Sequence, residues 1–353
     1  MLFVSVLTMV LSVLMMADLN KTAYVLGSSD YLLPLVRDYL FWFVPTLVFE
    51  VVILISMFVI RLDGAPKFAM WFNLISSAIN IVLDWLFIFP LQMGIGGAAL
   101  ATAISIFVGA VLSMWYLLFQ AKSLRLYPLS IGLRGFYLFV KAIAGQCYVG
   151  MAALWTEAML AVLMFMGNHI FMRYLGDNGV GAFGVSCYYI PFVYMVGNAI
   201  AQSAQPIISY NYGAASGERV RATEKIALRT AVAAGLGVMT FFILAPKFLV
   251  GLFLDISVPA AQLAVCGLPY FAAGFVCFIV NLTAIGYFQS VEKVKAATVF
   301  SLLRGFVFLV PIFWVMPRLF GVVGIWLAMP VSETLTFLFI GGYYLAKKFK
   351  FTA

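Results

Sequence analysis

Ten long apolar runs constrain the fold of this chain more than any other sequence feature. They cover roughly residues 1–17, 39–60, 68–90, 94–119, 143–172, 179–209, 226–246, 258–288, 297–316 and 320–346. A helix needs about 20 apolar residues to cross the hydrocarbon core of a bilayer. Charged residues are only 10% of the chain, against roughly 25% in soluble domains. The sequence therefore predicts an all-α membrane protein with about ten transmembrane helices.

The loops between these runs differ in charge from one side to the other. Those after the second, fourth, sixth, eighth and tenth runs hold 14 Lys and Arg residues, and the alternate loops hold five. Because cytoplasmic loops are enriched in Lys and Arg, we expect both termini to be cytoplasmic in an inner (plasma) membrane protein. The first group comprises Arg61, Lys67, Lys122, Arg125, Arg134, Lys141, Arg219, Arg221, Lys225, Lys293, Lys295, Lys347, Lys348 and Lys350.

The chain also resembles itself at an offset of 227 residues. The segment MGIGGAALATAIS (93–105) aligns with FGVVGIWLAMPVS (320–332), and five positions are identical, Gly94 with Gly321 among them. An internal repeat of this length predicts two pseudo-symmetric helical bundles. We expect an N-terminal bundle at 1–119, a cytoplasmic linker at 120–142, a C-terminal bundle at 143–346 and a basic cytoplasmic tail at 347–353.

The two bundles differ in their number of runs. The first has four runs and the second has six, and run three aligns with run nine. The two unmatched helices would therefore precede Met1. We expect the complete fold to contain twelve spans, with roughly ninety further residues ahead of Met1, which is enough for two helices.

Motifs of common catalytic and nucleotide sites are absent from the sequence. The four cysteines, Cys147, Cys187, Cys266 and Cys277, have no metal-binding spacing, and the single histidine, His169, has no Cys or His beside it. The sequence contains neither a Walker A motif nor GxGxxG. We therefore expect no enzymatic activity, no cofactor and no nucleic-acid partner.

A polar seam crosses the third apolar run. Asn73, Ser77, Asn80 and Asp84 stand at i, i+4, i+7 and i+11, so they share one helix face. The next run opens with small residues at four-residue spacing, which let membrane helices approach closely. A carboxylate in such surroundings is costly and is commonly functional.

Several motifs of this chain, in their order, resemble those of the multidrug and toxic compound extrusion (MATE) transporters. The segment QPIISYNYGA resembles the corresponding segment of the MepA-like bacterial branch of that family. The motifs are RLDGAPKFAM (61–70), N-x3-D at Asn80 and Asp84, MGIGGAALATAIS (93–105), GDNGVGAFGVSCYY (176–189), QPIISYNYGAASGERV (205–220), SLLRG (301–305) and FGVVGIWLAMPVSE (320–333).

The resemblance implies two six-helix bundles around a cavity that opens alternately to each side of the membrane. The first two helices of that family fold are the ones absent here. The resemblance also implies a secondary active antiporter that exports organic, often cationic drugs in exchange for Na⁺ or H⁺. We expect a monomer surrounded by membrane lipid.

The first-bundle coupling site is expected at Asn80, Asp84 and Thr102. A buried carboxylate changes charge when it binds a proton or a cation, and hard cations prefer oxygen ligands such as amide carbonyls and hydroxyls. The resemblance implies the same positions, together with an aspartate on a helix that this chain lacks. The alternative is that these residues only hydrogen-bond within the helix bundle.

A second-bundle coupling residue is expected at Glu157, because the resemblance implies that an acid on this helix takes part in coupling in some relatives. The alternative is a glutamate near the membrane interface. Cavity-lining residues are expected at Met164, Phe165, Asn168, Gln202, Gln205 and Asn281.

Three further ionisable residues lie within apolar runs. Glu50 and Glu333 are both candidates to attract a cationic drug, and either is a candidate partner for Arg304. The sequence does not choose between these roles.

Three other functions compete with drug export. A lipid-linked oligosaccharide flippase of the same superfamily would hold pyrophosphate with basic residues, of which the runs contain few. A membrane-embedded enzyme would need a clustered nucleophile, base or metal set. The third alternative is an inactive fragment of a MATE transporter.

Overall fold

The computed structural model describes residues 2–26, 30, 33–122 and 133–350. Within them the chain is helical, with no strand. It divides into two compact units, Met1–Ser130 and Ile131–Ala353, and this boundary falls inside the segment 120–142. Arg125 and the end of the tail, 351–353, lie outside the described residues. The tail residues up to Lys350 belong to the last helix.

The first unit begins with a sharply bent helix pair. Helices α1 and α2 meet at an angle of 103°, and the Asp18 side chain accepts a hydrogen bond from Lys21 N at the start of α2. Pro45 lies in the short 3₁₀ turn η1 between α3 and α4. The elements are α1 (Leu2–Ala17), α2 (Leu19–Val25), α3 (Leu33–Phe43), η1 (Val44–Thr46), α4 (Leu47–Leu62), α5 (Pro66–Ile88), α6 (Gly94–Trp115) and the π-helical turn η2 (Tyr116–Gln120).

The turn between α4 and α5 is fixed by a buried carboxylate. Gly64 has φ 87°, and Pro66 opens α5, where its missing N–H costs no hydrogen bond. Asp63 accepts hydrogen bonds from Tyr116 Oη at 3.0 Å and from Lys122 N at 2.9 Å. The motif RLDGAPK therefore ties this turn to the far end of α6 and η2.

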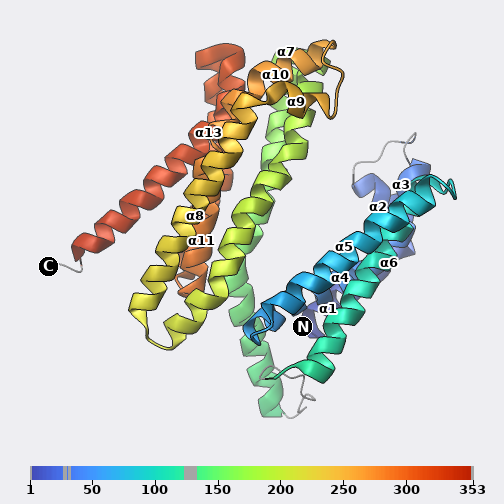
Figure 1. The fold of residues 1–353 in the computed structure, drawn as a ribbon, viewed down its shortest axis with the longest axis vertical. Helices are drawn as coiled ribbons and strands as arrows, with labels where there is room; N and C mark the ends of the chain where they lie inside the picture. The colour runs from blue at the N-terminus through green and yellow to red at the C-terminus, as the bar shows by residue number, and fades with distance from the viewer. Residues whose placement is uncertain (1, 27–29, 31–32, 123–132, 351–353) are drawn as a thin grey trace. The chain divides into compact units, whose positions relative to one another are not determined.

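The second unit has a bundle of long helices. In Figure 1, α8, α11 and the C-terminal part of α7 run side by side, and each of the three contacts the other two. The elements are α7 (Leu133–Gly213), α8 (Gly217–Leu244), α9 (Pro246–Gly251), α10 (Pro259–Ala272), α11 (Phe275–Ser290), α12 (Val294–Leu302), the π-helical segment η3 (Leu303–Phe308) and α13 (Leu309–Lys350).

Three Gly-x-x-Gly turns share one backbone geometry. The first glycine of each turn has φ 58°, 61° and 58°, in chain order. The second glycine lies against the preceding helix: a Cβ on Gly324 would lie 2.1 Å from the Met316 carbonyl oxygen. Because Gly94 and Gly321 are equivalent in the predicted repeat, their matching backbone supports that repeat. The turns are Gly94–Gly97, Gly176–Gly179 and Gly321–Gly324.

The predicted runs correspond to described helices, apart from residue 1. In the part of the chain that the structure describes, six helical stretches are long and apolar enough to cross a membrane, or eight if each of two bent pairs is one span. Two of the six break within their length, α7 at Gly176 and the continuous stretch from α12 to α13 at Gly321, so each contains two predicted runs. The run at 258–288 differs from expectation, because it forms two helices, α10 and α11, that meet at 48°.

The core of the second unit includes aromatic rings packed against glycines. Phe171 and Phe183 stack with ring centres 4.6 Å apart, and the Trp326 ring meets Phe171 edge-on at 4.7 Å. A Cβ on Gly267 would lie 1.9 Å from the Trp326 ring, and one on Gly167 would lie 2.1 Å from Phe183. The glycines thus let neighbouring helices close around large rings.

Candidate ion-coupling and substrate sites

The predicted polar seam of the first unit joins α5 to α6 through two side chains. Asn80 Nδ2 donates to Thr102 Oγ1 at 3.4 Å, and Thr102 Oγ1 donates to the Ala98 carbonyl at 3.0 Å. Ser76 Oγ donates to the Ser105 carbonyl at 2.6 Å. The structure thus brings together Asn80 and Thr102, two of the three residues expected to form the coupling site.

Not every residue of the seam crosses between the helices. Asn73 Nδ2 donates to the Ala69 carbonyl of its own helix at 2.8 Å. The hydroxyl that contacts α6 belongs to Ser76. The i, i+4 spacing predicts its neighbour Ser77 instead. A Cβ on Gly109 would lie 3.1 Å from Ser76 Oγ, so the small residue on α6 is the sequence signal for this contact.

Asp84, the third expected residue, lies one helical turn beyond Asn80. Its Oδ1 atom is buried and has no hydrogen-bond partner among the described residues. A buried carboxylate oxygen without a partner costs free energy that a proton or a cation would recover. The Asn80 and Thr102 oxygens nearby are also of the type that hard cations bind. The residues present therefore fit a small cation or a proton.

The second unit contains a buried ion pair. Arg304 Nε donates to Glu333 Oε1 at 2.7 Å, and the side chains are 1% and 0% exposed. Asn281 Nδ2 donates to the other carboxylate oxygen, Oε2, at 2.8 Å and to the Glu333 carbonyl at 2.9 Å. Of the two acids that the sequence left as candidate partners for Arg304, the structure selects Glu333.

The network holds polar atoms that have no protein partner. Arg304 Nη1 and Nη2 and Asn281 Oδ1 are buried without a hydrogen bond among the described residues. The Arg304 guanidinium lies 4.1 Å from the centre of the Phe278 ring, a cation–π contact. Arg304 stands in the π-helical segment η3, and such segments are frequent at functional sites.

Asn281 differs from its predicted role. The sequence places it among the cavity-lining residues, whereas its side chain is 1% exposed and bonded to Glu333. Arg304, Glu333 and Asn281 come from η3, α13 and α11, so no local spacing in the sequence reveals this cluster.

Glu157 lies on the N-terminal part of α7 with an exposed side chain. Tyr194 Oη, from the C-terminal part of the same element, donates to Glu157 Oε1 at 2.5 Å. The neighbouring Thr156 hydroxyl lies 2.9 Å from Ser301 Oγ, and a Cβ on Gly305 would lie 2.8 Å from Met159 Cβ. The helix that carries Glu157 therefore packs tightly against the segment that carries Arg304.

The other residues expected to line a cavity have mixed environments. Phe165 is 73% exposed, Asn168 is exposed, and Met164 and Gln202 are half-buried. Gln205 Nε2 donates to Gln289 Oε1 at 3.2 Å, which links α7 to α11. Their role in substrate binding stays a prediction.

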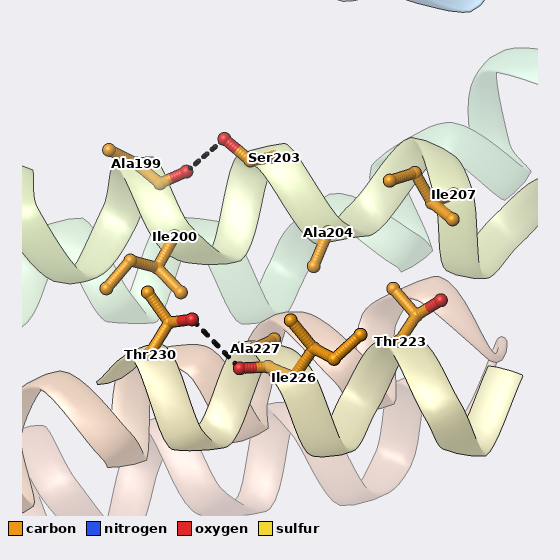
Figure 2. A pocket seen from close by; sticks show the side chains of 9 residues that line it. All are labelled: Ala199, Ile200, Ser203, Ala204, Ile207, Thr223, Ile226, Ala227 and Thr230. Carbon is orange, nitrogen blue, oxygen red and sulfur yellow. Dashed lines mark hydrogen bonds between the residues drawn. The ribbon is translucent and has the colours of Figure 1, made fainter. Parts of the chain in front are cut away.

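A separate apolar groove of about 350 Å³ runs between α7 and α8. Figure 2 shows the side chains of both helices along it, with Ile200 and Ile226 among them. The hydroxyls of Ser203, Thr223 and Thr230 donate to carbonyls four residues earlier on their own helices. Because these donors are already satisfied, the groove offers an apolar ligand surface.

Sequence relatives cover most of the chain. The sequence model of the MatE family matches residues 154–315. The multidrug export protein MepA of Staphylococcus saprophyticus is 24% identical over 322 residues, which is 90% of this chain and 68% of the relative. MepA of Staphylococcus aureus strain N315 is 23% identical over 317 residues, with the same two coverages.

Solved structures share the fold. A multidrug resistance MATE family transporter of the MOP superfamily, in an outward-facing conformation, has a TM-score of 0.82 at 20% identity over 98% of this chain and 78% of that chain. A MOP superfamily transporter from Pyrococcus furiosus, described by a binding pocket of reverse polarity that suggests a different function, has a TM-score of 0.84 at 17% identity. It covers 97% of this chain and 77% of that chain.

The motifs, the repeated glycine turns and these relatives agree with one another. The MatE match includes the buried Arg304, and the MepA alignments extend over both units. The chain is therefore similar to the MATE family of transporters, through its match to the MatE model and its likeness to MepA multidrug export proteins, and it shares the fold of solved MATE transporters.

Proposed function

We propose that this protein is a secondary active antiporter that exports organic, often cationic drugs in exchange for Na⁺ or H⁺. Its similarity to multidrug export proteins over 90% of the chain supports the transport class. The observation that carries the coupling is Asp84 Oδ1, a buried carboxylate oxygen without a hydrogen-bond partner on an apolar helix. An antiporter needs such a group, because binding of a coupling ion must shift the balance between two conformations.

Asp84 would act by changing its charge. When it binds a proton or Na⁺, its negative charge is neutralised, and the free-energy cost of burying it falls. Asn80 and Thr102 would orient the site and supply further oxygen ligands for Na⁺. The conformation that encloses Asp84 is then favoured only with the coupling ion bound, which links ion entry to drug release.

The second unit would contribute through Glu157 and its partner Tyr194. The Tyr194 hydroxyl holds the carboxylate in one orientation, and an exposed acid within the helix is a ligand for a cationic drug or a proton. Met164, Phe165, Asn168, Gln202 and Gln205 are the residues proposed to line the drug path. Phe and Met side chains there suit ligands of varied shape.

The surroundings of the protein follow from the same proposal. A monomer in the cell membrane, with both termini cytoplasmic and no cofactor, is sufficient for this mechanism. The apolar segments hold acids and few bases, which suits cationic or neutral cargo better than lipid-linked pyrophosphate.

Ethidium efflux from cells that lack their own exporters tests the proposal. Asp84→Asn removes the carboxylate with little change of volume and should lower ion-driven efflux about tenfold or more, equivalent to ~1.4 kcal/mol or more. Asp255→Asn, in an exposed turn, is the matched control and should leave efflux unchanged. Imposing a Na⁺ gradient or a pH gradient separately identifies the coupling ion.

Glu157→Gln and Tyr194→Phe complete the set. Both should reduce efflux while the protein level in the membrane stays normal. Unchanged ion-dependent efflux in Asp84→Asn and Glu157→Gln together would contradict the assigned coupling sites.

A further inference from the structure

A second concave site lies at one end of the second unit. It lies beside the connection from α7 to α8 and the connection from α11 to α12, and its volume is about 620 Å³. Arg221 and Tyr212 line it from the first connection, and Lys293 and Tyr287 line it from the second. None of these residues belongs to the proposed transport sites.

The rim of this basic pocket is built from two matching turns. Ala215 and Glu292 have φ 56° and 57°, which is uncommon for residues with a side chain. After each of them an amide donates back five residues, Ser216 N to the Asn211 carbonyl and Lys293 N to the Phe288 carbonyl, both at 2.9 Å. These Schellman-type closures fix the two connections that carry the charges.

The pocket holds two cations that make no close ion pair. Among the described residues, neither Arg221 nor Lys293 makes an ion pair within 4.0 Å. Arg221 Nε donates to the Gly217 carbonyl at 3.3 Å, which leaves its terminal N–H groups available. The nearby acid Glu224 accepts a hydrogen bond from Tyr344 Oη at 2.6 Å, lines a separate small cavity, and also interacts with the Tyr287 hydroxyl and with the charge of Lys293.

The rest of the pocket surface is apolar or aromatic. Val220 and Val291 are 5% and 3% exposed. The pocket therefore combines two cations and the Tyr212 side chain with apolar residues at the ends of membrane helices, which is the depth of lipid headgroups. A freely soluble anion would gain nothing from the apolar part.

We infer that this pocket binds the phosphate-bearing headgroup of an anionic membrane phospholipid. Arg221 offers a planar fork of donors and Lys293 a mobile point charge, the two side chains that proteins use most for phosphate. Basic pockets between transmembrane helices on the cytoplasmic side bind such headgroups. The positive-inside rule places both basic connections on that side.

Calorimetric titration of the full chain in a neutral detergent tests the inference. The probe is dioctanoyl phosphatidylglycerol, with dioctanoyl phosphatidylcholine and inorganic phosphate as parallel arms. Arg221→Gln and Lys293→Gln should each weaken phosphatidylglycerol binding about fivefold, and the double variant about 25-fold. Lys225→Gln removes an exposed cation of the same helix that does not line the pocket, and it should change binding less than about twofold.

Three results would overturn the inference. They are equal affinity of the unaltered protein and the double variant for phosphatidylglycerol, equal affinity for phosphatidylcholine, and inorganic phosphate binding as tightly as the lipid. Melting temperatures of all variants, measured without lipid, separate lost binding from lost folding. Because the measurement involves no transport, its outcome is independent of the proposed antiport.

Discussion

Arg304 and Glu333 form an ion pair with a 2.7 Å Nε–Oε1 distance in the interior of the second unit, where both side chains are almost completely buried. Asn281 holds the second oxygen of the same carboxylate. The pair joins η3 to α13, and Asn281 adds α11. These helices are thereby held together by charge in surroundings where a single charge would be costly.

Removing one member of this pair should destabilise the protein strongly. Glu333→Gln leaves the Arg304 charge buried without its partner, which costs ~3–5 kcal/mol. Thermal unfolding in detergent would show a large fall in melting temperature relative to the unaltered protein.

The double variant Arg304→Met/Glu333→Leu supplies the control. It replaces both charges by apolar groups of similar size, so it should recover most of the lost stability. If the double variant were no more stable than Glu333→Gln, the loss would not come from the unpaired charge.

The Asn80–Thr102 contact should set the affinity for the coupling ion. Thr102→Val keeps the shape and removes the hydroxyl that accepts from Asn80. Loss of one such oxygen is worth ~1 kcal/mol, so the ion concentration for half-maximal efflux should rise about fivefold. Efflux measured against Na⁺ and against pH gives this value.

Thr102→Ser is the matched variant, because it retains the hydroxyl and loses only the methyl group. It should behave like the unaltered protein. An equal shift in Thr102→Val and Thr102→Ser would assign the effect to packing and not to the oxygen.

The Gly-x-x-Gly turns should be intolerant of any side chain. In Gly324→Ala the new Cβ would lie 2.1 Å from the Met316 carbonyl oxygen, so backbone must move, and overpacking of this kind costs ~1–3 kcal/mol. Chemical or thermal unfolding would reveal the loss.

Gly342→Ala, on the same element α13, tests the same substitution in open space. No atom lies within 4 Å of its added Cβ, and alanine favours the helix by ~0.5–1 kcal/mol. It should therefore stabilise the protein slightly. A loss of stability in Gly342→Ala comparable to that in Gly324→Ala would mean that the turn contact is not responsible.

Asp63 should stabilise the packing of the turn between α4 and α5 against η2. Asp63→Ala leaves the Tyr116 hydroxyl and the Lys122 amide without this acceptor, and the buried Tyr116 hydroxyl left unpaired costs ~1–3 kcal/mol. Asp38→Ala, at an exposed position of α3, should have an effect within ~0.5 kcal/mol. Proteolysis at the end of η2 would accelerate only in Asp63→Ala.

The sequence predicts the helices well because hydropathy and glycine act locally. The apolar runs locate the spans, and the aligned Gly94 and Gly321 locate two turns with the same φ. The turn at Gly176 escapes the 227-residue alignment, because the position 227 residues before it lies ahead of Met1. The break between α10 and α11 also escapes, since no charged residue interrupts the run at that point.

The polar sites also differ in how far the sequence predicts them. The Asn80–Thr102 contact joins adjacent helices separated by a short turn, so spacing within one hairpin is enough to predict it. The Arg304, Glu333 and Asn281 cluster depends on the packing of three helices distant in the sequence. Periodicity shows that each residue lies in an apolar run, but it does not show which faces meet.

The turns at the two ends of the second unit obey different conformational rules. At one end, Gly176 and Gly321 combine positive φ with ψ −153° and −136°, close to a region that essentially only glycine occupies. At the other end, Ala215 and Glu292 have positive φ in turns of a type that non-glycine residues also adopt. The backbone therefore permits a change of side chain at Ala215 and Glu292, while it restricts Gly176 and Gly321 to glycine. We expect homologues to diverge at the first two positions and to retain the two glycines, whatever compound they carry.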